Sequence, residues 1–144
     1  MVSLRIALIG AACLIASVAP SISETMTFKT QLSPTDEVPP NNSNGKGDAT
    51  VTYDTVSKKL SWKVDYSGLT GPATMAHFHG PAGPGKNAPV VVPIFTSAAA
   101  AKSPAEGSAT LNDDQAKQLT AGEWYVNVHT EANKGGEIRG QLNK

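Results

Sequence analysis

Apolar and polar residues alternate along much of the chain after residue 25, which is the pattern of β-strands with one buried face. The segments 26–32, 48–53 and 60–66 all alternate in this way. The last two flank the polar stretch 54–59, so we expect them to form a hairpin. The side chains expected to point inward are Ala49, Val51 and Tyr53 in one strand and Leu60, Trp62, Val64 and Tyr66 in the other.

The second half of the chain contains four more segments with the character of strands. Residues 73–79, 123–129 and 137–142 are short and bounded by turn residues. Residues 89–95 are rich in β-branched side chains but include Pro93. Because proline cannot donate to a sheet ladder, we expect this strand to lie at an edge or to be bulged.

Glycine, proline and asparagine mark the connections between these segments. Residues 33–47 and 98–107 are predicted to be loops, the second of them exposed. Residues 80–85 alternate glycine and proline with one alanine, which excludes a helix or a central strand there. We expect turns at 80–85 and at 133–136.

One short helix is predicted between the fifth and sixth of these strands. Asn112 is suited to cap a helix, and Gln115 occupies the capping-box position three residues later. The helix should cover residues 115–119 and end before Gly122.

The elements together predict about eight short strands, spaced by roughly 8–15 residues, and one short helix. This pattern is typical of an antiparallel β-sandwich or barrel. The length of 144 residues indicates one domain with its own core. We place that domain at residues 24–144 and find no repeat of fixed period.

Residues 1–23 have the features of a secretory signal peptide. Arg5 provides the positive start, and the apolar run 6–18 is too short for a comfortable membrane span. Cleavage is expected after Ser23, with Ala19 as the alternative. The mature protein should therefore be periplasmic or secreted, with no membrane span.

The single cysteine of the chain, Cys13, lies inside this leader. A lipid-anchored cysteine is disfavoured because the residues before it lack leucine and the apolar run continues beyond it. The mature chain therefore has no cysteine, which excludes disulfides, thiolate nucleophiles and sulfur-rich metal sites.

The charge of the chain is balanced, with 12 basic and 12 acidic residues. The charges are scattered and form no run of one sign. This distribution argues against a nucleic-acid surface and against an electrostatic membrane patch.

The three histidines of the chain are the main candidates for chemistry. His77 and His79 share one face of strand 73–79, and His129 lies in strand 123–129. If the strands meet, the imidazoles converge on one ion, and three nitrogen ligands suit copper or, less well, zinc. Candidates for a fourth ligand or for supporting contacts are Met75, Tyr125 and Asn127.

Three ordered motifs resemble the CHRD domain, a family named from chordin and found in many secreted bacterial proteins. They are AHFHGPA at 76–82, WYVNVHT at 124–130 and GEIRGQL at 136–142. The resemblance extends over residues 26–142 and implies a secreted β-sandwich without implying a reaction. We therefore expect an all-β fold, an antiparallel β-sandwich of the immunoglobulin-like or superoxide-dismutase-like Greek-key kind, with one short helix.

The histidine pattern is also similar to part of the copper site of copper–zinc superoxide dismutase. That enzyme is another β-sandwich with a His-x-His strand, but it has more histidines, a bridging imidazole and a disulfide. Copper binding is therefore favoured over dismutase chemistry, and no catalytic residue is assigned.

Other interpretations of these residues are open at this stage. The histidines could be hydrogen-bonded structural residues, and the protein a metal-free module that contacts a protein or glycan through loops such as 80–88. Glu137 and Arg139 are expected to form a structural ion pair rather than to bind a ligand. Trp62 and Trp124 are expected in the core.

Overall fold

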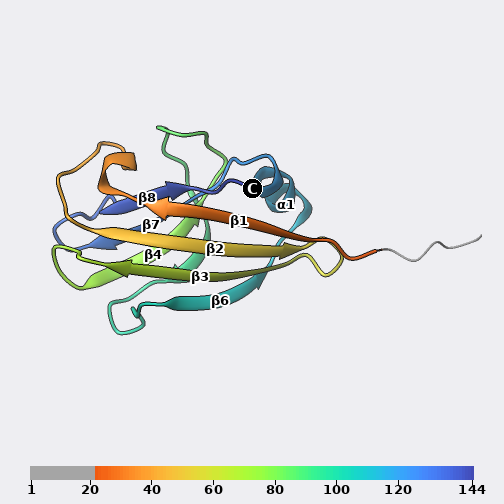
Figure 1. The fold of residues 1–144 in the computed structure, drawn as a ribbon, viewed down its shortest axis with the longest axis horizontal. Helices are drawn as coiled ribbons and strands as arrows, with labels where there is room; N and C mark the ends of the chain where they lie inside the picture. The colour runs from red at the N-terminus through yellow and green to blue at the C-terminus, as the bar shows by residue number, and fades with distance from the viewer. Residues whose placement is uncertain (1–21) are drawn as a thin grey trace, which may run out of the picture.

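The computed structural model describes residues 22–144 as two antiparallel four-stranded sheets packed face to face (Figure 1). The predicted leader, with Arg5 and Cys13, lies outside the described residues except for its last two positions. The elements are β1 (Thr25–Leu32), η1 (Pro34–Asp36), β2 (Lys46–Asp54), β3 (Lys59–Ser67), β4 (Ala73–His79), β5 (Val90–Phe95), β6 (Ala105–Thr110), α1 (Asp113–Thr120), β7 (Tyr125–Thr130) and β8 (Ile138–Gln141). The predicted all-β sandwich with one short helix is confirmed.

The first sheet has the order β1-β2-β3-β6 and the second β5-β4-β7-β8. The predicted hairpin is formed by β2 and β3. β3 pairs with β6, and β4 with β7, so connections pass between the sheets as in Greek-key sandwiches. Along one side, β1 and β8 lie next to each other (Figure 1), joined by backbone hydrogen bonds between Ser33 and Arg139.

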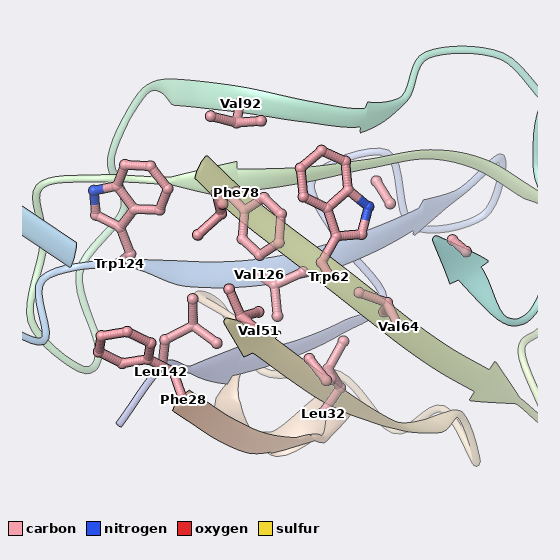
Figure 2. Packing of buried hydrophobic residues seen from close by; sticks show 14 of the residues in the cluster. Phe28, Leu32, Val51, Trp62, Val64, Phe78, Val92, Trp124, Val126 and Leu142 are labelled. Atoms are coloured by element: carbon pink, nitrogen blue, oxygen red, sulfur yellow. The ribbon is translucent and has the colours of Figure 1, made fainter. Parts of the chain in front are cut away.

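The core lies between the two sheets and contains the residues whose alternation predicted it (Figure 2). The inward residues expected in β2 and β3 are buried, except that Tyr66 is only half-buried. Both tryptophans are in this core, and Phe78 lies between them, with its ring centroid 5.4 Å from that of Trp62 and 6.1 Å from that of Trp124. The tryptophan prediction is confirmed.

The prediction of an exposed loop at residues 98–107 is wrong in part, because Ala105–Thr110 forms β6 at the edge of the first sheet. Its alanine, glycine and serine residues have weak strand propensity, so no alternation of large side chains reveals the strand. Small residues are needed there, because a Cβ added at Gly107 would lie 2.5 Å from the Trp62 ring.

The predicted helix cap is confirmed. Asn112 Oδ1 accepts a hydrogen bond from the backbone N–H of Gln115 at 2.8 Å, and Gln115 Oε1 accepts one from the N–H of Asn112 at 3.1 Å. The helix starts earlier than predicted and ends at Thr120, before Gly122. None of the helices in residues 22–144 has the length and apolar character needed to cross a membrane.

Replacing Asn112 by alanine should lower the free energy of unfolding by about 1 kcal/mol, because it removes the side-chain acceptor of the capping box. Urea denaturation followed by circular dichroism measures this change. Asn42→Ala is the matched control, since Asn42 is exposed, and its side chain should contribute little. Equal stability losses in the two variants would contradict the role of the cap.

Candidate metal centre

The three histidines lie on the outer face of the second sheet. In β4, Ala76 and Phe78 point into the core, which places the alternating residues His77 and His79 on the opposite face. In β7, the core residues Val126 and Val128 likewise leave Tyr125, Asn127 and His129 on the outer face. The register aligns Met75 with His129, His77 with Asn127 and His79 with Tyr125.

This outer face is nevertheless buried, because two connections fold over it. Every residue of β7 is buried, including those that point away from the core. The segment 81–89 contacts the face through Ala88, whose N–H donates to the Tyr125 hydroxyl at 3.2 Å. The turn before β8 covers the other end, where the Lys134 carbonyl accepts from His129 at 2.9 Å. The imidazoles therefore lie in an enclosed layer rather than on an open surface.

The ligand atoms of the three histidines form a compact group. One nitrogen from each of His77, His79 and His129 lies within 4.8 Å of the other two. The closest pair is His77 Nδ1 and His129 Nε2, at 3.2 Å. Nitrogens bound to one ion at about 2 Å are about 3.3 Å apart in a tetrahedral site. The spacing of the closest pair is near this value, and the cluster could hold a metal that replaces the proton shared by His77 Nδ1 and His129 Nε2.

Backbone carbonyls define which ring nitrogens are free. His79 Nδ1 lies 2.9 Å from the Ala88 carbonyl oxygen, and His129 Nδ1 lies 2.9 Å from that of Lys134. A carbonyl oxygen only accepts, so both Nδ1 atoms carry the proton, and both Nε2 atoms present a lone pair. A metal-binding histidine commonly donates its other N–H in this way.

Asn127 places a further acceptor beside these lone pairs. Its Oδ1 lies 3.1 Å from His79 Nε2. With the proton of His79 on Nδ1, this nitrogen and this oxygen direct lone pairs into the same space. A cation in that space would satisfy both atoms.

Burial keeps the three imidazoles neutral at physiological pH. Burial, followed by the neighbouring imidazoles of His129 and His79, lowers the pKa of His77 to about 4. Burial also lowers the pKa of His79 and of His129, although hydrogen bonds to backbone carbonyls partly oppose it. Neutral imidazole is the form that binds metals, so protons do not compete for these nitrogens near pH 7.

A stack of planar groups fixes the ring of His79. This ring lies parallel to that of Tyr125, with centroids 4.8 Å apart and 1° between the planes. Arg139 on β8 places its guanidinium carbon 3.4 Å from the centroid of the Tyr125 ring. Because β7 lies between β4 and β8, the tyrosine is flanked by histidine on one side and arginine on the other.

The predicted ion pair between Glu137 and Arg139 is not formed in the described part of the chain. Both residues are buried, and each has its own partners. Arg139 contacts Tyr125 and the backbone carbonyl of Lys86. The Glu137 carboxylate accepts hydrogen bonds from the side chains of Ser43, Thr70, Thr130 and Asn133 and from the backbone N–H of Thr70. Alternation predicts only that the two charged side chains lie on one face. The loops that bury them and supply their other partners are not visible in the sequence, so the sequence predicts a pair that the described residues do not form.

Sequence reasoning missed the groups that support the histidines. The carbonyls of Ala88 and Lys134 belong to the backbone, so the residue types at these positions do not reveal their contact with the histidines. Glu37 is buried near Asn127 and Arg139, yet it lies in a segment that the sequence predicts only as loop. Of the candidates for a fourth ligand, Asn127 contacts a histidine directly through its side chain, and Tyr125 does so by stacking. Met75 is half-buried and faces His129 in the register.

Gly80 allows the end of β4 to approach Trp124 closely. A Cβ added there would lie 2.5 Å from Cδ1 of Trp124 and 3.1 Å from the Glu123 carbonyl oxygen. Gly80→Ala should therefore shift His79, lower the unfolding free energy by about 1–3 kcal/mol and weaken the binding of any metal that the histidines hold. Gly83→Ala is the control, since a Cβ at Gly83 meets nothing within 4 Å. Denaturation and metal titration of both variants test this, and equal behaviour would contradict it.

Comparison with known proteins identifies a family without supplying an activity. A sequence model of the CHRD domain matches residues 28–142, which include both histidine-bearing strands and most of both sheets. No curated protein and no solved structure matches the chain. The match confirms the family that the three motifs indicated, and the chain belongs to the CHRD domain family.

Proposed function

We propose that this protein binds a single copper ion through His77, His79 and His129. The observation that carries the proposal is the arrangement of three buried, neutral imidazoles whose ligand nitrogens lie within 4.8 Å of one another. Backbone carbonyls already hold the non-binding nitrogens of two of them. This preorganisation lowers the cost of ordering the ligands when an ion enters.

Copper is favoured over zinc on the chemistry of the ligands. Divalent copper lies above zinc in the affinity order of nitrogen and oxygen sites. The site has no thiolate, because the only cysteine of the chain is Cys13 in the predicted leader. Asn127 Oδ1, which lies 3.1 Å from His79 Nε2, would offer the ion a further oxygen contact.

The binding proposal is tested by titrating chelator-treated protein with Cu(II) and with Zn(II) in competition with a chelator of known affinity. The expected result is one copper per chain and tighter binding of copper than of zinc. His77→Gln, which keeps a polar side chain of similar length, should lose this binding while the protein remains folded. Copper affinity that does not change in His77→Gln would contradict the proposal.

The alternative is a metal-free module that binds a protein or glycan through loop 80–88. It predicts that His77→Ala lowers stability without any change in metal content. The Lys86 carbonyl, the Asn87 side chain and the Ala88 N–H hydrogen-bond to the sheet below, while most residues of the loop are exposed. Superoxide-dismutase-like redox chemistry would require bound copper with an open coordination position, and our proposal is limited to binding.

We also propose that the protein is exported and that residues 1–23 are removed. The apolar run 6–18 after Arg5 supports this proposal. N-terminal sequencing of the protein recovered from the periplasm or medium tests it. The expected first residue is Glu24, and a chain retained with Met1 in the cytoplasm would contradict export.

A further inference from the structure

The ligands that the described chain offers at the histidine cluster are formally neutral. The cluster consists of His77, His79 and His129, and no Asp or Glu side chain of residues 22–144 belongs to it. The amide of Asn127, whose Oδ1 lies 3.1 Å from His79 Nε2, is neutral as well. None of these ligands offsets the positive charge of a bound ion.

Arg139 adds a buried positive charge to the same layer. Its guanidinium carbon lies 3.4 Å from the centroid of the Tyr125 ring, and the other face of that ring stacks on His79. The residue is 2% exposed and forms no salt bridge with any residue of 22–144. Burial lowers the pKa of His79, and the charge of Arg139 acts in the same direction, so this charge reaches the cluster.

Glu37 does not reverse this balance, whatever its protonation state. Its carboxyl group lies against Gly136 beside Asn127 Nδ2, whereas Asn127 Oδ1 faces His79. Burial raises the pKa of Glu37 to about 7, and Arg139 acts in the opposite direction, so the two groups interact. An ionised Glu37 is matched by the charge of Arg139, and a protonated Glu37 is neutral. In neither state do the two groups together add a negative charge beside the cluster.

Glu137 is a buried carboxylate that does not act on the cluster. Its hydrogen-bond donors are Ser43, Thr70, Thr130 and Asn133. After burial, the charged groups that lower the pKa of His77 are His129 and His79, and the one that lowers the pKa of His129 is His79. The surroundings of the cluster in the described chain therefore carry no net negative charge.

A buried site of this kind favours an ion of low charge. The cost of transferring an ion from water into a buried site rises with the square of its charge. Repulsion by Arg139 is about twice as large for Cu(II) as for Cu(I), because it is proportional to the charge of the ion. No carboxylate or thiolate ligand of the described chain offsets the second charge.

Met75 brings a soft sulfur atom to the same face. β4 pairs Ala73 with Thr130 and Met75 with His129, and the extra residue between Ala73 and Met75 makes a bulge. Directly paired residues of neighbouring strands point to the same face, so Met75 shares the face of the histidines. It is half-buried and is not among the hydrophobic residues packed against the core. Thioether ligands select Cu(I), and the three rotatable bonds of methionine let its sulfur adjust to an ion.

We propose that the histidine site, provided that it binds copper as proposed above, prefers Cu(I) to Cu(II) and uses Met75 as an additional ligand for Cu(I). The three imidazoles bind the ion in either oxidation state. The buried guanidinium of Arg139 disfavours the second charge, and the thioether of Met75 adds affinity for the softer ion.

Two competition titrations of the chelator-treated protein at pH 7 test this preference. One uses Cu(I) under nitrogen with ascorbate and a chelator specific for Cu(I), and the other uses Cu(II) and a Cu(II) chelator of known affinity. The expected Kd for Cu(I) is lower than that for Cu(II) by at least about tenfold. A Kd for Cu(II) that is equal or lower would overturn the preference and leave the proposed copper site standing. If neither ion binds, both proposals fail.

Met75→Leu tests the thioether, because leucine keeps the size of the side chain and removes the sulfur. It should raise the Kd for Cu(I) by at least about tenfold and leave that for Cu(II) within about threefold. Met26→Leu is the matched control, since Met26 packs against the core from β1 and should leave both affinities unchanged. Wild-type Cu(I) affinity in Met75→Leu would overturn the role of Met75.

Arg139→Gln tests the buried charge. It should reduce the ratio of the Cu(II) Kd to the Cu(I) Kd by about tenfold, whereas Arg139→Lys keeps the charge and should hold that ratio within about threefold. An unchanged ratio in a folded Arg139→Gln protein would overturn the role of Arg139. If amide NMR shows that Arg139→Gln is not folded, the wild-type ratio and Met75→Leu decide.

Discussion

Replacing His129 by alanine is expected to weaken copper binding by more than about a hundredfold, since even loss of a group behind a metal ligand costs up to about that factor. His129 provides the Nε2 atom that lies 3.2 Å from His77 Nδ1, so its loss leaves two imidazoles on β4 without a partner from β7. Competitive titration with a chelator measures the change. A three-histidine site cannot retain wild-type affinity after this substitution.

The matched control for His129→Ala is Lys134→Ala. The Lys134 backbone carbonyl accepts the hydrogen bond from His129 Nδ1, whereas its side chain is 74% exposed and pairs only with Glu131. Removing that side chain keeps the carbonyl and should leave copper affinity unchanged. If both variants lose affinity equally, the turn at 133–136 rather than the imidazole determines binding.

Glu137→Gln is expected to lower the unfolding free energy by about 3–5 kcal/mol, a large loss for a single substitution. The Glu137 carboxylate is fully buried and accepts five hydrogen bonds, from Ser43, Thr70 (twice), Thr130 and Asn133. A glutamine replaces one acceptor oxygen with an N–H₂ group that faces donors. Urea denaturation measures the loss, and Glu106→Gln on the exposed side of β6 should change stability by less than about 0.5 kcal/mol.

The same carboxylate makes the fold sensitive to strong acid. Burial alone would raise the pKa of Glu137, but hydrogen bonds from Ser43, Thr130 and Thr70 outweigh it and lower the pKa to about 2. The folded state therefore binds this proton less tightly than the unfolded state, whose pKa is 4.5. The contribution of the ionised Glu137 carboxylate to the free energy of unfolding is complete above pH 4.5 and is lost as the pH falls toward 2. Denaturation curves between these pH values should show this loss in the wild type and a smaller one in Glu137→Gln.

The parts of the fold that the sequence predicts are those with local physical signals. Alternation identifies β2 and β3 because each has one face in the core, and the capping box at Asn112 identifies the start of α1. Alternation also places His77 with His79, and Tyr125, Asn127 and His129 together, because a strand directs alternate side chains to one face whatever covers them.

The features that the sequence does not predict depend on contacts between distant segments. β6 is missed because Ala105 and Gly107 carry no strand signal of their own, and because the bulk of Trp62 requires a glycine at position 107. The burial of Arg139 depends on the segment 81–89, which appears in the sequence only as a glycine- and proline-rich turn. The same holds for Glu37, since nothing in its local sequence indicates that it is buried beside β7 and β8.

The most direct measurement of the central claim is the electron spin resonance spectrum of metal-free protein with one equivalent of Cu(II). Binding by His77, His79 and His129 predicts a single defined copper species at one-to-one stoichiometry, with splitting from coordinated nitrogen. The same sample of His129→Ala should give a different spectrum. The absence of a defined one-to-one signal, or a signal that is unchanged in His129→Ala, would contradict the copper site.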